Sequence, residues 1–226
     1  MRPQIISSFS SAQDWKKYCF GMPGKYFKII HFKNWTASKK IHIINFSNLK
    51  ESKLKCIEYG IKEAIGLTGL KFEIIRIKDK KDYKKFVDAC VDGGKISSKK
   101  LLSGAIKKRK YDGVDCADIF ILNYPIYSNG IIIRDGEALS FVPEGVSMFT
   151  FDAKINYPGS FLKKRAKHES LHLLGLNAHH EDTKVKGYKQ DVLCNMRYNA
   201  PSEFLCAKCK NAIVSFWRGV ENSKSV

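Results

Sequence analysis

The chain has 226 residues, of which 44% are hydrophobic and 12% aromatic, a globular composition that excludes wholesale disorder. Lysine and arginine number 40 against 22 acidic residues, so the formal net charge of +18 raises nucleic acid, anionic membranes and acidic proteins as partners. No apolar run approaches the length of a membrane span, and the first residues lack the apolar centre of a secretory signal. We therefore expect a cytoplasmic protein without a membrane segment.

The predicted elements follow an N-terminal extension over residues 1–38, in which Ser-rich and basic pieces surround one apolar run. Apolar runs of strand length predict strands, and apolar residues that recur every three to four positions predict helices. We expect strands at 41–46, 71–77, 117–123, 131–133, 138–142 and 146–151. We expect helices at 51–65, around 83–90, at 160–174 and at about 201–217.

The ends of the last two helices carry specific signals. Asn156 or Ser160 is expected to cap the helix that follows Pro158, and Gly175 stops it. Pro201 is expected in the first turn of the final helix.

Strands that alternate with helices, followed by a cluster of strands, predict an α/β fold with a mixed sheet and flanking helices. We divide the chain into the extension and one domain over residues 39–226. Its N-terminal subdomain spans 39–175 and its C-terminal subdomain spans 176–226.

The positive charge is concentrated between Arg76 and Lys110. This segment holds 13 basic and 4 acidic residues, a net of 13 − 4 = +9. It is either a solvated helix face with a loop, or a docking patch for an acidic partner such as RNA or a ribonucleoprotein. Few aromatic residues are interleaved with the lysines, which weighs against binding of single-stranded nucleic acid.

The run His168-Glu169-Ser170-Leu171-His172 is the most specific chemical feature. Helix positions i and i+4 share a face, so both imidazoles can reach one ion, and zinc favours neutral imidazole nitrogen. Glu169 lies about 100° around the helix from His168, where a carboxylate can accept a proton from a water polarised by the metal. Without a metal, the same run is a helix with two surface histidines and an ordinary glutamate.

The residues after this helix support the metal interpretation. Gly175 ends the helix and forces a turn, and a pair of histidines lies just past that turn. Three cysteines then lie close together in the sequence, and clustered cysteine and histidine in an intracellular protein indicate a metal site more often than a disulfide. These residues are His179, His180, Cys194, Cys206 and Cys209.

The segments HESLHLLGLNAHH, CNM and CAKC together resemble the archaemetzincins, a branch of the metzincin metalloproteases. The resemblance covers roughly residues 160–212. It implies a metzincin-like mixed sheet with flanking helices, a zinc-binding active-site helix and a C-terminal helical subdomain held together by a second zinc ion. It further implies a catalytic zinc, a general base and a methionine floor beneath the ion, which are assigned to His168, His172 and His179, to Glu169, and to Met196.

Two departures from the family pattern concern the histidine pair. Three residues separate Gly175 from His179, where the family has two, so His180 stays open as an alternative third ligand. His180 also stands where the family has a cysteine. A second, structural zinc would then be held by three thiolates and one imidazole, a known closed zinc geometry. Its ligands would be His180, Cys194, Cys206 and Cys209, and two zinc ions are expected in all.

Three further expectations concern other residues. In metzincins the substrate backbone adds to an exposed edge strand, and we place that edge at residues 138–142. Tyr198 has the Met-to-Tyr spacing of other metzincins, and it either stabilises the oxyanion or is simply packed. The scattered cysteines and the histidines in apolar runs are expected in the core or at its edge; they are Cys19, Cys56, Cys90, Cys116, His31 and His42.

Two functions follow from these features. The first is a zinc metallopeptidase that hydrolyses a peptide or protein substrate with zinc-activated water and Glu169 as the general base. The alternative is a non-catalytic scaffold, stabilised by zinc, that binds an acidic partner through the basic segment.

Overall fold

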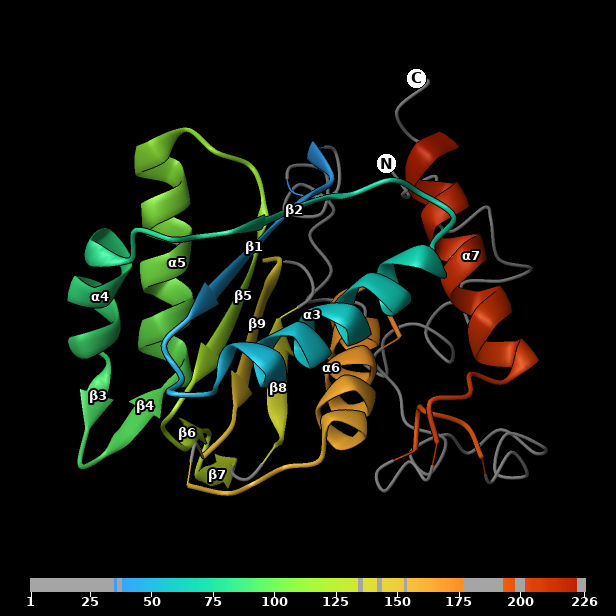
Figure 1. Ribbon diagram of the computed structural model, residues 1–226. Helices are drawn as coiled ribbons and strands as arrows, with labels where there is room; N and C mark the ends of the chain where they lie inside the picture. The colour runs from blue at the N-terminus through green and yellow to red at the C-terminus, as the bar shows by residue number, and fades with distance from the viewer. Residues whose placement is uncertain are drawn as a thin grey trace.

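The computed structural model describes residues 35, 38–133, 136–141, 144–152, 154–176, 193–197 and 202–222. Strands and helices alternate along the first half of this chain (Figure 1), which confirms the predicted α/β class. The strands are β1 (Lys40–Asn45), β2 (Glu73–Arg76), β3 (Val91–Asp92), β4 (Lys95–Ser97), β5 (Ala117–Leu122), β6 (Ile126–Ser128), β7 (Ile131–Ile133), β8 (Ala138–Phe141) and β9 (Val146–Thr150). The helices are α3 (Glu51–Gly66), α4 (Lys81–Asp88), α5 (Ser98–Asp112), α6 (Gly159–Leu173) and α7 (Ala207–Asn222).

The larger of two sheets has the strand order β2-β1-β5-β9-β8. Strands β2, β1, β5 and β9 run parallel to one another, whereas β8 runs antiparallel to β9 and forms one edge. The mixed sheet is therefore confirmed, and the predicted edge segment lies at its edge. A second sheet, β3-β4-β6-β7, was not predicted; one of its hairpins turns at Asn129 and Gly130, whose positive φ angles suit a two-residue turn.

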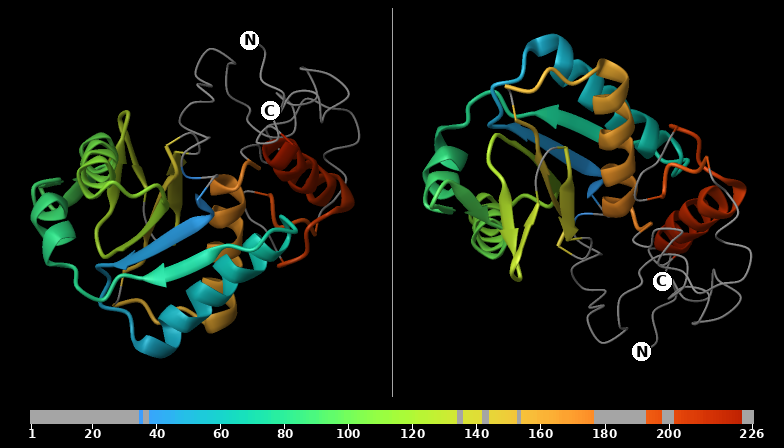
Figure 2. Two further views of the ribbon diagram at one scale, coloured as in Figure 1. Left: turned by 90° about the horizontal axis from the view of Figure 1, so that it is seen from above. Right: turned by 90° about the horizontal axis from the view of Figure 1, so that it is seen from below.

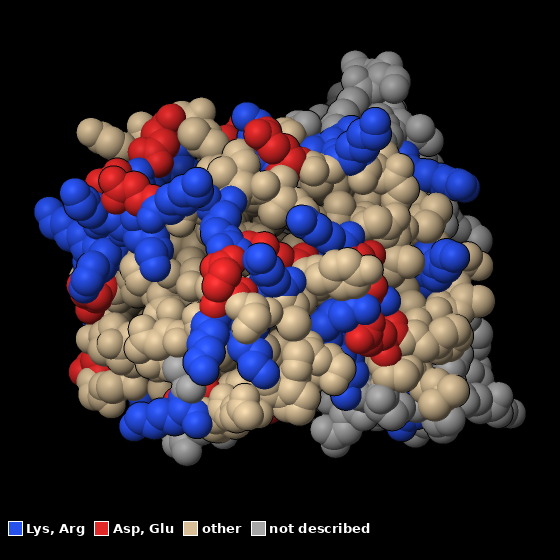
Figure 3. Space-filling model, viewed as in Figure 1, with Lys and Arg blue, Asp and Glu red and all other residues tan. Residues whose placement is uncertain are grey.

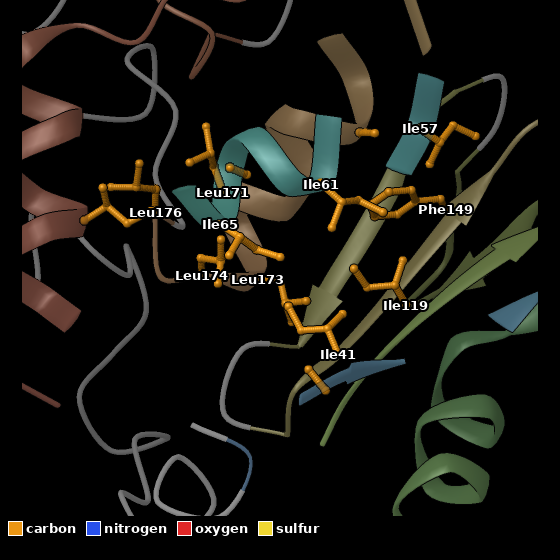
Figure 4. Packing of buried hydrophobic residues seen from close by; sticks show 14 of the residues in the cluster. Ile41, Ile57, Ile61, Ile65, Ile119, Phe149, Leu171, Leu173, Leu174 and Leu176 are labelled. Carbon is orange, nitrogen blue, oxygen red and sulfur yellow. The ribbon is translucent and has the colours of Figure 1, made fainter. Parts of the chain in front are cut away.

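Helices cover both faces of the larger sheet (Figures 1 and 2). α3 and α6 lie on one face, where Ile61 of α3 and Ile119 of β5 belong to the same buried cluster, the first core (Figure 4). α4 and α5 lie on the other face, where Leu101 of α5 and Phe120 of β5 belong to a second buried cluster, the second core. Successive residues of a strand point to opposite faces, so the uniformly buried β5 supplies both cores.

α3 and α6 approach each other closely at Gly60. A Cβ atom at this position would lie 2.2 Å from the carbonyl oxygen of Lys163 and 2.9 Å from the amide nitrogen of Lys167. Both contacts are with the backbone of α6, so rotation of a side chain cannot relieve them. Lys163 and Lys167 also form ion pairs with Glu63 of α3, at 2.9 and 3.3 Å. The position of α6 therefore depends on a glycine in α3.

α7 is joined to the first core by an aromatic cluster. Trp217 is fully buried and packs edge-on against Trp35 and Phe72, with ring centroids 5.8 and 5.2 Å apart. Its indole N–H donates a hydrogen bond of 3.0 Å to the carbonyl oxygen of Leu174, directly after α6. The C-terminal helix is thus bonded to the end of the helix that carries the histidines.

Two sequence predictions about helix ends were wrong. The residue that caps α6 is Pro158, without a side-chain hydrogen bond, so neither Asn156 nor Ser160 caps it. The final helix begins at Ala207 and not near Pro201. Gly175 does follow the end of α6, and its φ of +112° explains why glycine is needed there.

α5 was not predicted because its apolar face is narrow. Its buried residues are only Ser98, Leu101 and Ala105. The helix is instead defined at its ends: the Ser97 hydroxyl accepts from the amide of Lys100, and Gly113 closes the helix with a φ of +64°.

Among the described residues, no helix combines the length and the apolar character that a bilayer crossing requires.

We expect Gly60→Ala to lower the free energy of unfolding by about 1–3 kcal/mol, because the new methyl group must push α6 away from α3. Urea denaturation measures this change. Gly66→Ala in the same helix is the matched control: nothing lies within 4 Å of its Cβ position, so it should leave stability unchanged or raise it. Equal effects of the two substitutions would contradict the close packing at Gly60.

Candidate metal centre

The last turns of α6 hold the predicted zinc ligands. Every residue from His168 to Leu173 is buried, and this part of the helix is packed into the first core. His168 and His172 are 2% and 7% exposed, and their rings lie edge to face with centroids 4.7 Å apart. Imidazoles four residues apart on one helix face meet in this way, as the sequence spacing predicts.

Each imidazole is oriented by a backbone carbonyl. His168 Nδ1 lies 2.5 Å from the carbonyl oxygen of Asn195, and His172 Nδ1 lies 2.6 Å from that of Leu176. A carbonyl oxygen only accepts hydrogen bonds, so each Nδ1 carries the proton. In neutral rings each Nε2 is then an acceptor, which is the ligand form of histidine.

The two acceptor nitrogens converge. His168 Nε2 and His172 Nε2 are 3.1 Å apart, although neither ring has a proton to share between them in this tautomer. Two nitrogens bound to one tetrahedral zinc at 2.0–2.1 Å would be about 3.3 Å apart. The donor set therefore fits a zinc ion, whose positive charge would bring the two lone pairs together.

The turn after α6 places the carbonyl that orients His172. Gly175 donates to the carbonyl oxygen of His172 and Leu176 donates to that of Leu171, at 3.0 and 2.8 Å. The left-handed φ of Gly175 turns the chain back, so that Leu176 lies under the helix end. The glycine predicted to stop the helix therefore also supports a histidine.

Glu169 lies beside the histidines, and one of its carboxylate oxygens is within 4.8 Å of a ring nitrogen of each. Burial raises the pKa of Glu169 to about 8; Arg165 opposes this effect and Glu137 adds to it. A cation next to the carboxyl group would favour its ionised, proton-accepting form.

The sheet edge is bonded to the same turn of α6. Ser140 of β8 donates a hydrogen bond of 3.3 Å to the carbonyl oxygen of Glu169, and it also contacts the hydroxyl of Ser147 of β9 at 2.8 Å. The edge strand is therefore fixed relative to Glu169 by a side chain that the sequence analysis did not single out.

Three cysteines form a second cluster at the start of α7. Cys194, Cys206 and Cys209 are all buried, and their sulfur atoms lie within 4.8 Å of one another. The sulfurs of Cys194 and Cys209 are 3.9 Å apart, too far for a disulfide but close to the roughly 3.8 Å expected of two thiolates on one tetrahedral zinc. The cluster thus fits the sulfur ligands of a structural zinc.

Backbone amides surround these sulfurs. The amide of Cys206 points to the sulfur of Cys194 at 3.4 Å, and that of Cys209 points to the sulfur of Cys206 at 3.5 Å. Hydrogen bonds with the thiols of Cys194 and Cys206, followed by burial, raise the pKa of Cys209, and a bound cation would favour its thiolate form instead.

One short segment joins the two clusters. Cys194 belongs to the sulfur cluster, the carbonyl of Asn195 orients His168, and Met196 is fully buried in the first core. The Asn195 side chain is itself held by the carbonyls of Lys164 and Ser202. A displacement of the cysteine cluster would therefore be transmitted to His168 through Asn195.

The remaining predicted site residues, His179, His180 and Tyr198, lie outside the described residues. Sequence reasoning missed the carbonyls of Asn195 and Leu176, because a backbone carbonyl carries no residue-type signal. The only sequence features that could have pointed to these carbonyls are the neighbouring residues Cys194 and Gly175.

Two solved structures resemble the fold of this chain. One is the archaemetzincin of Archaeoglobus fulgidus in complex with malonate, with a TM-score of 0.50 and 14% identity; the match covers 76% of this chain and 99% of that one. The other is the archaemetzincin of Methanopyrus kandleri, with a TM-score of 0.53 and 13% identity, covering 83% of this chain and 96% of that one. The chain has the archaemetzincin fold.

At these identities the likeness concerns the fold alone. No protein-family model matches the sequence, and no curated protein matches it either. The archaemetzincin fold nevertheless agrees with the resemblance of the motif-bearing segments, since the sequence had implied a mixed sheet and a helix bearing two histidines.

In the metal-free protein, we expect stability to fall as the pH rises from about 5 to about 8. An unfolded glutamate has a pKa of about 4.3, so in this range the unfolded chain releases a proton that folded Glu169 retains. Urea denaturation of the chelated protein at several pH values measures the slope. Glu169→Gln should reduce it, whereas Glu73→Gln, which alters an exposed residue of β2, should not. Identical slopes for wild type and Glu169→Gln would refute this expectation.

Proposed function

We propose that this protein is a zinc-dependent metallopeptidase. The observation that carries the proposal is that the Nε2 atoms of His168 and His172 lie 3.1 Å apart. The Nδ1 atom of each ring is held by a backbone carbonyl oxygen. Buried imidazoles arranged in this way are suited to a metal ion and unsuited to an ordinary surface helix. The archaemetzincin fold supports the same function.

His168 and His172 would hold the catalytic zinc together with His179, and His180 is the alternative third ligand. Bound there, zinc supplies Lewis-acid polarisation of the scissile carbonyl and of an attacking water. Glu169 would accept the proton of that water and deliver it to the leaving amine. Tyr198 is a candidate donor to the oxyanion.

A peptide substrate would lie along β8. This strand is the antiparallel edge of the larger sheet, and no strand among the described residues pairs with its outer side, where a peptide could add. Because Ser140 joins β8 to the carbonyl of Glu169, a peptide paired with β8 would be held in a defined position relative to the general base.

A second zinc, bound by Cys194, Cys206 and Cys209 with His180, would have a structural role. Its support is the short sulfur separation and the burial of all three thiols. Through Asn195 it would hold the carbonyl that orients His168.

We expect Glu169→Gln to reduce kcat/KM on a peptide library by about 10²–10⁴-fold while zinc content stays the same, because the base is lost and the ligands remain. His172→Ala should lose both zinc and activity. Peptide cleavage followed by mass spectrometry, together with metal analysis, measures these outcomes. Glu73→Gln, on the strand at the opposite sheet edge, is the control that should keep full activity. Zinc-loaded wild type that cleaves no peptide would refute the proposal.

We also propose that the basic segment docks an acidic partner such as RNA. The support is a face of α5 on which exposed lysines lie within about 100° of helix rotation: Lys99, Lys100, Lys107 and Lys110. Basic side chains gather over α4 and α5 (Figure 3). Other basic residues of the segment are engaged internally, since Lys108 pairs with Asp112 and Arg109 with Asp118.

We expect simultaneous replacement of Lys99, Lys100 and Lys107 by alanine to weaken binding of a short RNA and to reduce the slope of log affinity against log salt by about 2. Fluorescence anisotropy across a salt series measures both quantities. Replacement of exposed Lys55, Lys62 and Lys71 removes the same charge elsewhere and should change the slope less. Equal effects of the two triple variants would mean that only net charge matters and that α5 is a solvated face.

A further inference from the structure

A third group of potential metal ligands lies on the opposite face of the larger sheet from α6. It consists of His42 of β1, Asp118 of β5 and Cys116, two residues before Asp118. In the parallel β1–β5 pair, His42 is directly opposite Asp118. Residues two apart in extended chain share a face, so the strand register itself brings Cys116, Asp118 and His42 together.

The three ligand atoms form a nearly equilateral triangle. His42 Nδ1 is 3.4 Å from Cys116 Sγ and 3.6 Å from Asp118 Oδ1, and Cys116 Sγ is 3.6 Å from the same oxygen. Nitrogen, sulfur and oxygen ligands at their usual distances from one tetrahedral zinc would be separated by about 3.4–3.6 Å. The arrangement therefore has the dimensions of three corners of a zinc tetrahedron.

These contacts do not form a relay that activates a nucleophile. In a thiol–imidazole–carboxylate relay, the thiol contacts one ring nitrogen and the carboxylate contacts the other. Here the sulfur and the carboxylate oxygen both approach Nδ1 of His42. All three polar atoms face one point, as ligands of an ion do.

Burial makes the ionisation of this group depend on a nearby cation. The side chains of Cys116 and Asp118 are inaccessible to solvent, and His42 is 12% exposed. Burial, together with Arg109 and Lys40, lowers the pKa of His42, which keeps the ring in its neutral, ligand form. A divalent cation would balance one thiolate and one carboxylate, whereas a buried thiolate and carboxylate without it would repel each other.

Arg109 of α5 supports the second oxygen of the carboxylate. Its Nε lies 3.2 Å from Asp118 Oδ2, within ion-pair distance, but not aligned as a hydrogen bond, and Oδ2 has no hydrogen bond with the described residues. The guanidinium is fixed by the backbone carbonyls of Cys116 and Glu144. It thus orients Asp118 and leaves Oδ1 directed at the sulfur and the imidazole.

The group adjoins a cavity of about 430 Å³, whose lining includes Trp35, Arg109, Cys116 and Glu144. Cys116 belongs to the wall of this cavity, although its side chain is inaccessible to solvent. Three protein ligands leave the fourth position of a tetrahedral zinc ion to a water or another small ligand.

We propose that His42, Cys116 and Asp118 bind a zinc ion whose fourth ligand is a water or another small molecule. The mixed nitrogen, sulfur and oxygen set favours zinc over magnesium or calcium, which prefer oxygen ligands alone. The site is independent of the proposed peptidase, because it lies on the other face of the sheet and shares no residue with the α6 and cysteine clusters.

Metal analysis and cobalt substitution of the full chain test the proposal. Cys116→Ala and His42→Gln should each lower bound zinc by one ion per chain in titration against a competing chelator. Cobalt-loaded Cys116→Ala should also lose part of the thiolate-to-cobalt absorption. Cys90→Ala is the matched control, since this buried thiol lies in the second core and contacts the carbonyl of Phe86. It should keep the wild-type metal content and spectrum.

The site can be separated from the centre on α6. His172→Ala should lose a different ion, so that its combination with His42→Gln loses two. Circular dichroism checks that each variant is folded; His42→Gln alters a partly exposed side chain and provides the measurement if Cys116→Ala does not fold. Wild-type zinc content in folded His42→Gln would overturn the proposal, whatever the outcome of the peptidase assay.

Discussion

The candidate zinc site depends on two backbone carbonyls that lie outside the helix bearing its histidines. Asn195 and Leu176 accept from the Nδ1 atoms, and in doing so they select the tautomer and aim both Nε2 atoms at one point. Side-chain spacing on α6 alone would allow either ring to rotate. The carbonyls remove that freedom, and burial of the helix end keeps water from competing for the same nitrogens.

Those carbonyls are in turn held by the C-terminal part of the chain. Leu176 follows a left-handed glycine, and the preceding Leu174 accepts from the indole of Trp217 in α7. Asn195 follows Cys194 directly, and the cysteine cluster spans from this segment to the start of α7. α7 is therefore bonded close to the supports of both histidines, and a metal ion bound by the three cysteines would hold those supports in place.

The two faces of the larger sheet carry different kinds of side chain. On one face, α3 and α6 bury an apolar cluster and approach so closely that only glycine fits at position 60. On the other face, the same β1 and β5 strands place His42, Cys116 and Asp118 beneath Arg109 of α5. Because side chains alternate along a strand, one pair of parallel strands supplies both an apolar surface and a polar cluster.

The sequence by itself determined the α/β class, most strand positions, the pairing of His168 with His172 and the role of Gly175. Each of these depends on local periodicity or on a residue type that the backbone requires. It failed at α5, whose narrow apolar face gives little periodic signal, and at Pro201, because a proline suited to a helix start does not by itself begin one.

Only the tertiary structure decided which carbonyls orient the histidines, that Ser140 joins the edge strand to Glu169, and that His42 lies opposite Asp118. The residues of these contacts are 4 to 76 positions apart in the chain, and the long-range ones carry no local pattern. Register between parallel strands is set by how the two cores pack, so a histidine in one apolar run and a carboxylate in another become neighbours only when the sheet forms.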